Sequence, residues 1–306
     1  MAFRPSAAAR PLPEPAPDLL EPRRQKPRRN WGPFLYLSSP VAVLLLLFAG
    51  PMAILVLYSF QDRGRAGTGA WTLSNYETVT QAFYWQVALD TLIIALWAMA
   101  VLLVLAYPLA YVVAFKSGKW EIPLLLMLVL SDELNPLVRI FAWKTVLGRQ
   151  GVINTFLEWA HVIDQPLDWL LFTKFTVIVV LSVSWLPYTV LPIYAAMKTI
   201  DRELIEAAQD LGAGWWTIFR KILLPLTAAG FMATVIIVFI PILSDYAAPV
   251  LVGGTEGIMI SAIIGDEFLA RGQWGIGSAL TFVLLAVSSF IVWLSYKLTN
   301  VKRLQA

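Results

Sequence analysis

Residues 91–115 read TLIIALWAMAVLLVLAYPLAYVVAF and contain no charged side chain. An α-helix rises about 1.5 Å per residue, so roughly 20 apolar residues cross the ~30 Å hydrocarbon core of a bilayer. This segment therefore predicts a membrane-spanning helix. Five other apolar segments predict further spans, and charged residues interrupt the second of them: Leu35–Phe60, Ile122–Leu147, Phe175–Met197, Thr227 to about Leu243, and Ile276–Leu298.

The composition of the whole chain agrees with this pattern. Hydrophobic residues make up 58% of the 306 residues and charged residues only 14%, whereas soluble domains carry charge on about a quarter of their residues. We predict an all-α membrane protein with about six transmembrane helices, occupying residues 31–306. Residues 1–30 are rich in Pro, Ala and Arg and have no apolar period, which predicts a disordered cytoplasmic tail.

Several kinds of site are excluded by what the sequence lacks. The chain has no cysteine and a single histidine, His161. It therefore cannot build a disulfide, a zinc–thiolate site or a histidine-rich metal site, and we expect no metal site. No G-x-x-x-x-G-K-[ST] phosphate loop occurs, so we expect no ATP site of that type in this chain.

The distribution of basic residues predicts the orientation of the spans. With the N-terminus inside, sixteen of the 23 Lys and Arg residues fall on the cytoplasmic side and seven on the opposite side. Cytoplasmic segments of membrane proteins carry such an excess of basic residues. We therefore predict that both termini are cytoplasmic, and the net charge of +3 then needs no nucleic-acid partner to explain it.

The longest cytoplasmic connection in this topology runs from Lys198 to Pro225. Asp201 is suited to cap a short helix, and Gly212 is suited to end that helix in the left-handed conformation. Residues from Gly214 to Leu224 then predict a second helical piece. Between cap and glycine, apolar residues recur at helical spacing: Leu204, Ile205, Ala208 and Leu211. Such a rigid hairpin of two short helices suits the docking of a partner protein.

The same loop carries a longer motif. It reads Glu206-Ala207-Ala208, then Gly212, then Ile222-Leu223-Leu224-Pro225. This resembles, at every defined position, the loop signature E-A-A-x3-G-x9-I-x-L-P of permeases of type I ABC importers. The resemblance implies the permease fold and an inner-membrane location. The residues alone leave one alternative, a generic amphipathic helix at the membrane interface.

In that family the loop is the coupling helix, which fits a cleft on the ATPase subunit. The resemblance therefore implies the following coupling residues: Glu206, Ala207, Ala208, Gly212, Ile222, Leu224 and Pro225. It also implies a second permease subunit, two copies of a cytoplasmic ABC ATPase, and a periplasmic substrate-binding protein. ATP and Mg²⁺ would be bound by the partner ATPase, and no cofactor by this chain.

A narrower resemblance covers most of the chain from Trp71 to Leu298. The segments that are similar to the spermidine/putrescine permeases are WTLSNY (71–76), LVRIFAW (137–143), GRQGVIN (148–154), IPILSDY (240–246) and LVGG (251–254). This implies a small organic cation, polyamine-like, as the substrate. Another small amine, an amino-acid-like molecule or another organic ion is the alternative. Where those permeases have an apolar or aromatic stretch, this chain has SDELNP at 131–136, which leaves the exact substrate open.

The segment that differs from those permeases, residues 131–136, places charged side chains inside the membrane. Asp132 lies ten residues past Ile122, about 15 Å into the layer and near its midplane. A carboxylate at that depth costs several kcal/mol unless it is paired or faces water. Pro136 removes a backbone hydrogen bond and predicts a broken helix, as at transporter sites. The candidate pathway residues are Asp132, Glu133, Arg139 and Asp245. The equally favoured interpretation is that Asp132 or Glu133 pairs with Arg139, or with the second permease subunit, and only holds helices together.

Three functions are compatible with these observations. The first is an ATP-driven importer permease, which supplies a pathway and coupling but no covalent chemistry, and so is not an enzyme. The second is an integral membrane enzyme using Asp132 and Glu133 as acid and base. The third is a proton-coupled secondary transporter, which an inverted repeat would favour, and the sequence shows no convincing internal repeat. We expect the first.

Overall fold

The structure, a computed structural model, describes residues 32–61 and 70–298. The tail predicted over residues 1–30 lies outside the described residues. The chain divides into two compact units, Met1–Met52 and Ala53–Ala306, and each is described by itself. In the first unit the described residues form the N-terminal part of α1 (Gly32–Ser59), which contains Pro40 and Pro51.

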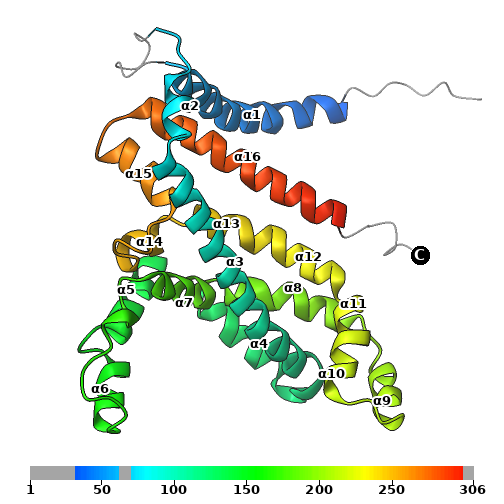
Figure 1. The fold of residues 1–306 in the computed structure, drawn as a ribbon. Coiled ribbons are helices and arrows are strands. Elements are labelled where there is room, and N and C mark those ends of the chain that lie inside the picture. The colour runs from blue at the N-terminus through cyan, green and yellow to red at the C-terminus, as the bar shows by residue number, and fades with distance from the viewer. Residues whose placement is uncertain (1–31, 62–69, 299–306) are drawn as a thin grey trace, which may run out of the picture. The chain divides into compact units, whose positions relative to one another are not determined.

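Helices account for most of the described part of the second unit (Figure 1). The only β-structure among the described residues is an isolated bridge between Gln61 and Trp71. The helices of its first half are α2 (Ser74–Val79), α3 (Ala82–Tyr111), η2 (Val112–Lys116), η3 (Gly118–Trp120), α4 (Glu121–Leu130), α5 (Pro136–Leu147), α6 (Val152–Trp159) and η4 (Asp168–Leu170).

The second half continues with a series of mostly short helices and ends with α16, which has 25 residues. These are α7 (Lys174–Ser184), α8 (Leu186–Lys198), α9 (Arg202–Asp210), α10 (Trp215–Ile218), η5 (Phe219–Leu223), α11 (Leu224–Leu226), α12 (Ala228–Thr234), η6 (Val235–Phe239), α13 (Ile240–Ser244), α14 (Ala247–Val252), α15 (Ile260–Leu269) and α16 (Trp274–Leu298). The predicted all-α membrane fold is confirmed.

Five of the six predicted spans have a counterpart among the described helices. Three single helices are long and apolar enough to cross a membrane: Pro40–Ser59, Ala82–Lys116 and Trp274–Ser295. Two bent pairs meet the same criteria. Helices α7 and α8 meet at a bend of 48°, and Trp215–Leu226 meets Ala228–Ser244 at a bend of 69°.

The predicted third span, Ile122–Leu147, is not one helix. Helix α4 has 10 residues and α5 has 12, so neither reaches the ~20 residues that cross a bilayer. The Asn135 side chain accepts a hydrogen bond from the Leu137 N–H at 2.9 Å, and Pro136 occupies the first turn of α5. An Asn cap followed by proline begins a new helix. The segment therefore consists of two short helices, and the predicted break at Pro136 is confirmed.

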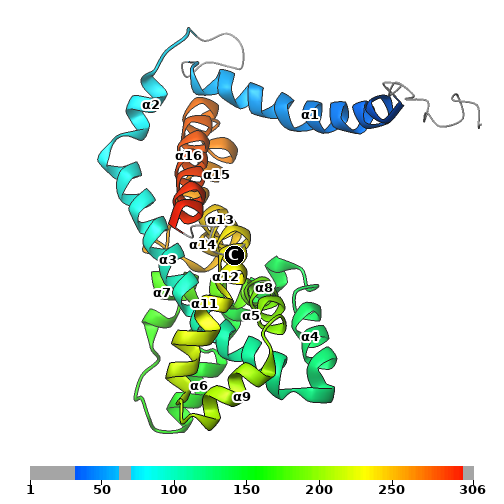
Figure 2. The ribbon, with the colours of Figure 1, turned by 90° about the vertical axis from the view of Figure 1, so that its right-hand side faces the viewer.

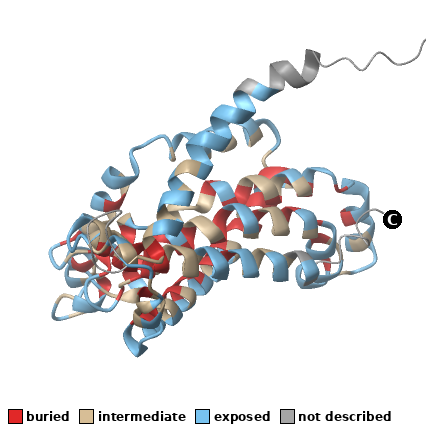
Figure 3. Ribbon diagram, turned by 90° about the horizontal axis from the view of Figure 1, so that it is seen from above, coloured by how far each residue is buried: buried red, intermediate tan, exposed pale blue. Residues whose placement is uncertain are grey.

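Helix α3 is the central element of the second unit. It packs along α7 and α8, and α12 packs along α8 (Figures 1 and 2). Its residues Ala98, Leu102, Ala106 and Ala110 recur every fourth position and are fully buried. Small side chains allow neighbouring helices to approach closely, and the Ser182 hydroxyl of α7 donates to the Ala98 carbonyl at 3.3 Å. Figure 3 shows buried residues on the inner faces of these helices and exposed residues on the outer faces.

Candidate functional site

The loop between α8 and α12 has the local structure that its sequence predicts. The Asp201 side chain caps α9 by accepting a hydrogen bond from the Glu203 N–H at 3.0 Å. Gly212 has a φ of +79°, the left-handed region in which a Cβ is unfavourable. The Gly212 N–H donates to the Gln209 carbonyl and the Ala213 N–H to the Ala208 carbonyl. This pair of hydrogen bonds is a Schellman motif, so the helix ends at a fixed turn.

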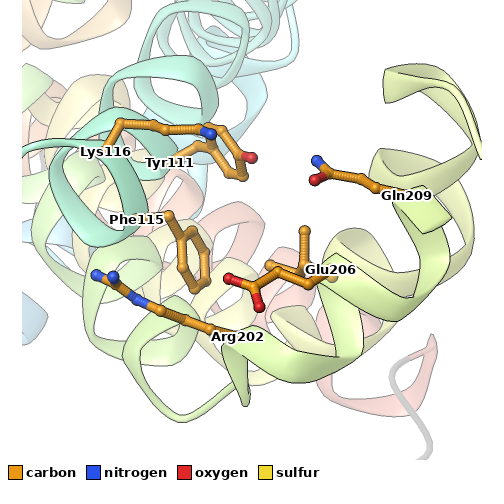
Figure 4. Close-up of a pocket in the computed structure, with 7 residues that line it drawn as sticks. Tyr111, Phe115, Lys116, Arg202, Glu206 and Gln209 are labelled. Atoms are coloured by element: carbon orange, nitrogen blue, oxygen red, sulfur yellow. The ribbon is translucent and has the colours of Figure 1, made fainter.

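One face of α9 is attached to the end of α3. Ile205 is buried in a cluster that includes Tyr111 of α3 and Ala114 of η2. The Arg202 guanidinium donates to the Ala114 carbonyl at 3.2 Å. Figure 4 shows the small polar pocket of about 90 Å³ that remains between the two elements. Its labelled side chains are Tyr111, Phe115, Lys116, Arg202, Glu206 and Gln209. The attachment ties α9 to the helix at the centre of the unit.

The other face of the loop is exposed. Ala207 is exposed, Ala208 is half-buried, and Leu211 at the tip is 88% exposed. Glu206 is exposed as well, but it lies on the side that lines the pocket (Figure 4). In the second helical piece Ile222 is half-buried, while Leu224 and Pro225 are exposed. The hairpin therefore has a fixed base and an open outer surface.

A second cluster of functional candidates lies at the break between α4 and α5. The Arg139 Nη1 atom is 2.8 Å from the Asp132 Oδ1 atom. The Tyr188 hydroxyl donates to the other carboxylate oxygen of Asp132 at 2.5 Å. One carboxylate thus joins α5, through Arg139, to α8, through Tyr188.

A cavity of about 190 Å³ adjoins this ion pair. Breaks in three parts of the chain meet there: the 131–135 turn, the bend between α7 and α8, and the junction between α13 and α14. The lining residues are Asp132, Pro136, Arg139, Ile140, Ser184, Trp185, Tyr188, Asp245, Ala247 and Ala248. Broken helices that converge on one cavity are characteristic of transporter binding sites.

The cavity unites three of the four predicted pathway residues. The Asp245 carboxylate accepts a hydrogen bond from the Ala248 N–H at 2.9 Å and also interacts with Trp185 and Arg139. Glu133 is exposed and does not line this cavity. Sequence reasoning missed Trp185 and Tyr188. A tyrosine inside an apolar segment, directly after Pro187, was the available signal.

A further polar cluster joins α4 to α8 near the loop. The Tyr194 hydroxyl donates to Glu121, and the Lys198 Nζ atom lies 2.9 Å from a Glu121 carboxylate oxygen. These hydrogen bonds, chiefly the one from Tyr194, lower the pKa of Glu121 below its ordinary value. Glu121 precedes the predicted span and was not singled out from the sequence. In the described part of the chain, no group of three His, Cys, Asp or Glu side chains is placed to hold a metal.

Comparison with known proteins identifies the family. Residues 81–301 match the family described as "Binding-protein-dependent transport system inner membrane component". The spermidine/putrescine transport system permease protein PotB of Escherichia coli K12 is 33% identical over 267 residues, covering 86% of this chain and 97% of that protein. PotB of Haemophilus influenzae is 32% identical over 257 residues, covering 82% and 90%.

Solved structures agree on the fold. A bacterial ABC transporter that imports the acidic polysaccharide alginate has a chain with a TM-score of 0.71 and 18% identity, covering 89% of this chain and 96% of that one. The resemblance drawn from the loop motif is confirmed. This chain belongs to the family of inner membrane components of binding-protein-dependent transport systems.

Proposed function

We propose that this chain is the permease subunit of an ATP-driven importer that moves a polyamine-like organic cation from the periplasm to the cytoplasm. The observation that carries the proposal is the match to the PotB proteins over nearly their whole length. Those proteins are spermidine/putrescine permeases, and the match continues through the loop and the cavity. The finer assignments of partners and orientation belong to the same proposal.

The loop supports coupling to a separate ATPase. Its base is fixed by the Ile205 contact to Tyr111 of α3 and by the Arg202 hydrogen bond to Ala114 of η2, while Ala207 and Leu211 are exposed on its outer side. A partner that moves this outer face would therefore move the end of α3. In this proposal the coupling residues are Glu206, Ala207, Ala208, Gly212, Ile222, Leu224 and Pro225. Two ATPase copies bind ATP and Mg²⁺, a second permease completes the pathway, and a periplasmic binding protein delivers the substrate.

The orientation follows from charge. The bias of sixteen basic residues to seven favours cytoplasmic termini, and it places the loop on the side where ATP is available. The opposite side then receives the binding protein. In this role the chain moves its substrate without covalent chemistry.

The test is uptake by the complete importer in liposomes, with radiolabelled spermidine and putrescine and with the binding protein present. Uptake that requires ATP and the binding protein is expected. Deleting residues 206–212 should release the ATPase from the membrane subunits and abolish uptake. ATPase association that survives this deletion would contradict the coupling role. Uptake driven by a proton gradient without ATP would instead favour a secondary transporter.

A further inference from the structure

The cavity beside the α4–α5 break has an unbalanced set of charges. It contains two carboxyl groups, those of Asp132 and Asp245, and one guanidinium, that of Arg139. Formally, one positive charge is lacking. Trp185 and Tyr188 add aromatic surface to the lining, and aromatic faces attract cations. The volume of about 190 Å³ far exceeds the roughly 10–15 Å³ that one water requires. The chemistry of this cavity suits an organic ammonium group.

Arg139 is held incompletely at its present position. It meets the Asp132 carboxylate through Nη1 alone, and the same nitrogen reaches the Ser131 carbonyl at 3.4 Å. Its buried Nε atom has no hydrogen-bond partner among the described residues. Arg–carboxylate pairs gain most when two parallel hydrogen bonds form. A pair joined through one nitrogen is therefore easier to exchange than a bidentate one.

A second acceptor for the same guanidinium is already present. Asp245 lines the same cavity as Arg139, and no hydrogen bond or ion pair joins the two side chains among the described residues. Buried charges are costly when they lose their partner, so Arg139 can leave Asp132 only if both groups are paired again. Asp245 supplies the new partner for Arg139, and an incoming cation supplies the new partner for Asp132.

We propose that Arg139 acts as an internal counter-ion that the substrate displaces. An ammonium group of the transported amine binds the Asp132 carboxylate, to which Tyr188 still donates, and Arg139 moves to Asp245. Two carboxylates then face two cations, so the occupied cavity is neutral. This inference rests on the proposed amine substrate and assigns it a binding site inside the permease. It distinguishes this site from an ion pair that only holds helices together.

The experiment uses the complete importer in liposomes at saturating spermidine-loaded binding protein. Spermidine uptake and binding-protein-stimulated ATP hydrolysis are measured together. The decisive variant is Asp132→Asn combined with Arg139→Gln, because it removes both members of the ion pair together and leaves neither without the other. A matched control is Asp90→Asn with Lys174→Gln. That pair, 2.6 Å apart, joins α3 to α7 and does not line the cavity.

The decisive variant should retain stimulated ATP hydrolysis while spermidine uptake falls about tenfold or more, as expected when a charged hydrogen-bond partner is lost. In the control variant, any decrease in spermidine uptake should be matched by an equal fractional decrease in ATP hydrolysis. Uptake equal to wild type in the decisive variant would show that the pair is structural and would overturn the site. If wild type transports no amine, the proposed substrate fails, and the site fails with it.

If the importer that carries the double substitution does not assemble, a second variant tests whether the Asp132 carboxylate binds the amine. Tyr188→Phe keeps the ring and the charges and removes only the hydrogen bond to Asp132. It should lower spermidine uptake severalfold, with ATP hydrolysis unchanged. Unchanged uptake in this variant would contradict a role of the Asp132 carboxylate in binding the amine.

Discussion

Gly230 of α12 lies directly against Pro192 of α8. A Cβ added at Gly230 would meet the Pro192 carbonyl oxygen at 2.6 Å and the Ala196 Cβ at 2.7 Å. Neither neighbour is the end of a flexible side chain, so the contact can be relieved only by separating two helices. The broken fifth span is therefore held against the fourth at a distance that only glycine permits.

We expect Gly230→Ala to destabilise the permease by about 1–3 kcal/mol, the usual cost of overpacking. The measurement is the thermal unfolding temperature of the purified complex. Gly214→Ala is the matched control, since Gly214 has no atom within 4 Å of the added Cβ and its φ of −70° suits alanine. Equal unfolding temperatures for the two variants would refute the close contact.

The left-handed turn at Gly212 leads to a prediction about the coupling loop. Alanine at a φ of +79° costs of order 1–3 kcal/mol, whereas asparagine tolerates this region better. We expect Gly212→Ala to weaken ATPase association, and Gly212→Asn to weaken it less. Co-purification of the ATPase with the membrane subunits measures the difference. A stronger defect in the asparagine variant would contradict the conformational explanation.

The features that the sequence predicted well are local ones. The Asp201 cap and the Gly212 turn depend on residues within a few positions of each other, and both are confirmed. The start of α5 was also readable locally, because Asn135 followed by Pro136 is a helix-start signal.

The cavity could be predicted only in part. A pairing of Arg139 with Asp132 or Glu133 was one of two open interpretations, and the structure shows the Asp132 pair, formed across the break. Tyr188 and Asp245 reach the same cavity through bends and breaks in two other spans. Such bends depend on how the helices pack against one another, and no fixed residue spacing in the sequence indicates them. The sequence therefore could not predict that these distant residues line one cavity.

Glu121 leads to a prediction about pH. Because hydrogen bonds lower its folded-state pKa from the ordinary 4.5, its charge stabilises the fold above that value. The contribution is lost as the pH falls through the lowered folded pKa. We expect wild type to unfold at a higher temperature than Glu121→Gln at pH 7, with the gap narrowing below about pH 4.5. If the difference in unfolding temperature between the two proteins stays constant down to pH 3, the charge of Glu121 is not its cause.

Arg202 leads to a prediction about coupling that rests on the proposed function. Its guanidinium links α9 to the Ala114 carbonyl at the end of the α3 segment, so it transmits movement of the loop to the central helix. We expect Arg202→Gln to keep the ATPase bound, because the exposed outer residues Ala207 and Leu211 are unchanged. Fewer amine molecules should then enter per ATP hydrolysed.

The ratio of spermidine uptake to ATP hydrolysis in liposomes measures this coupling. Arg220→Gln serves as the charge-matched control, since Arg220 is exposed on the second helical piece of the same loop. A lower ratio for Arg202→Gln alone would show that the tether couples the loop to α3. Equal ratios for the two variants would mean that the buried Ile205 contact suffices, and that the Arg202 hydrogen bond serves only to fix α9 in place.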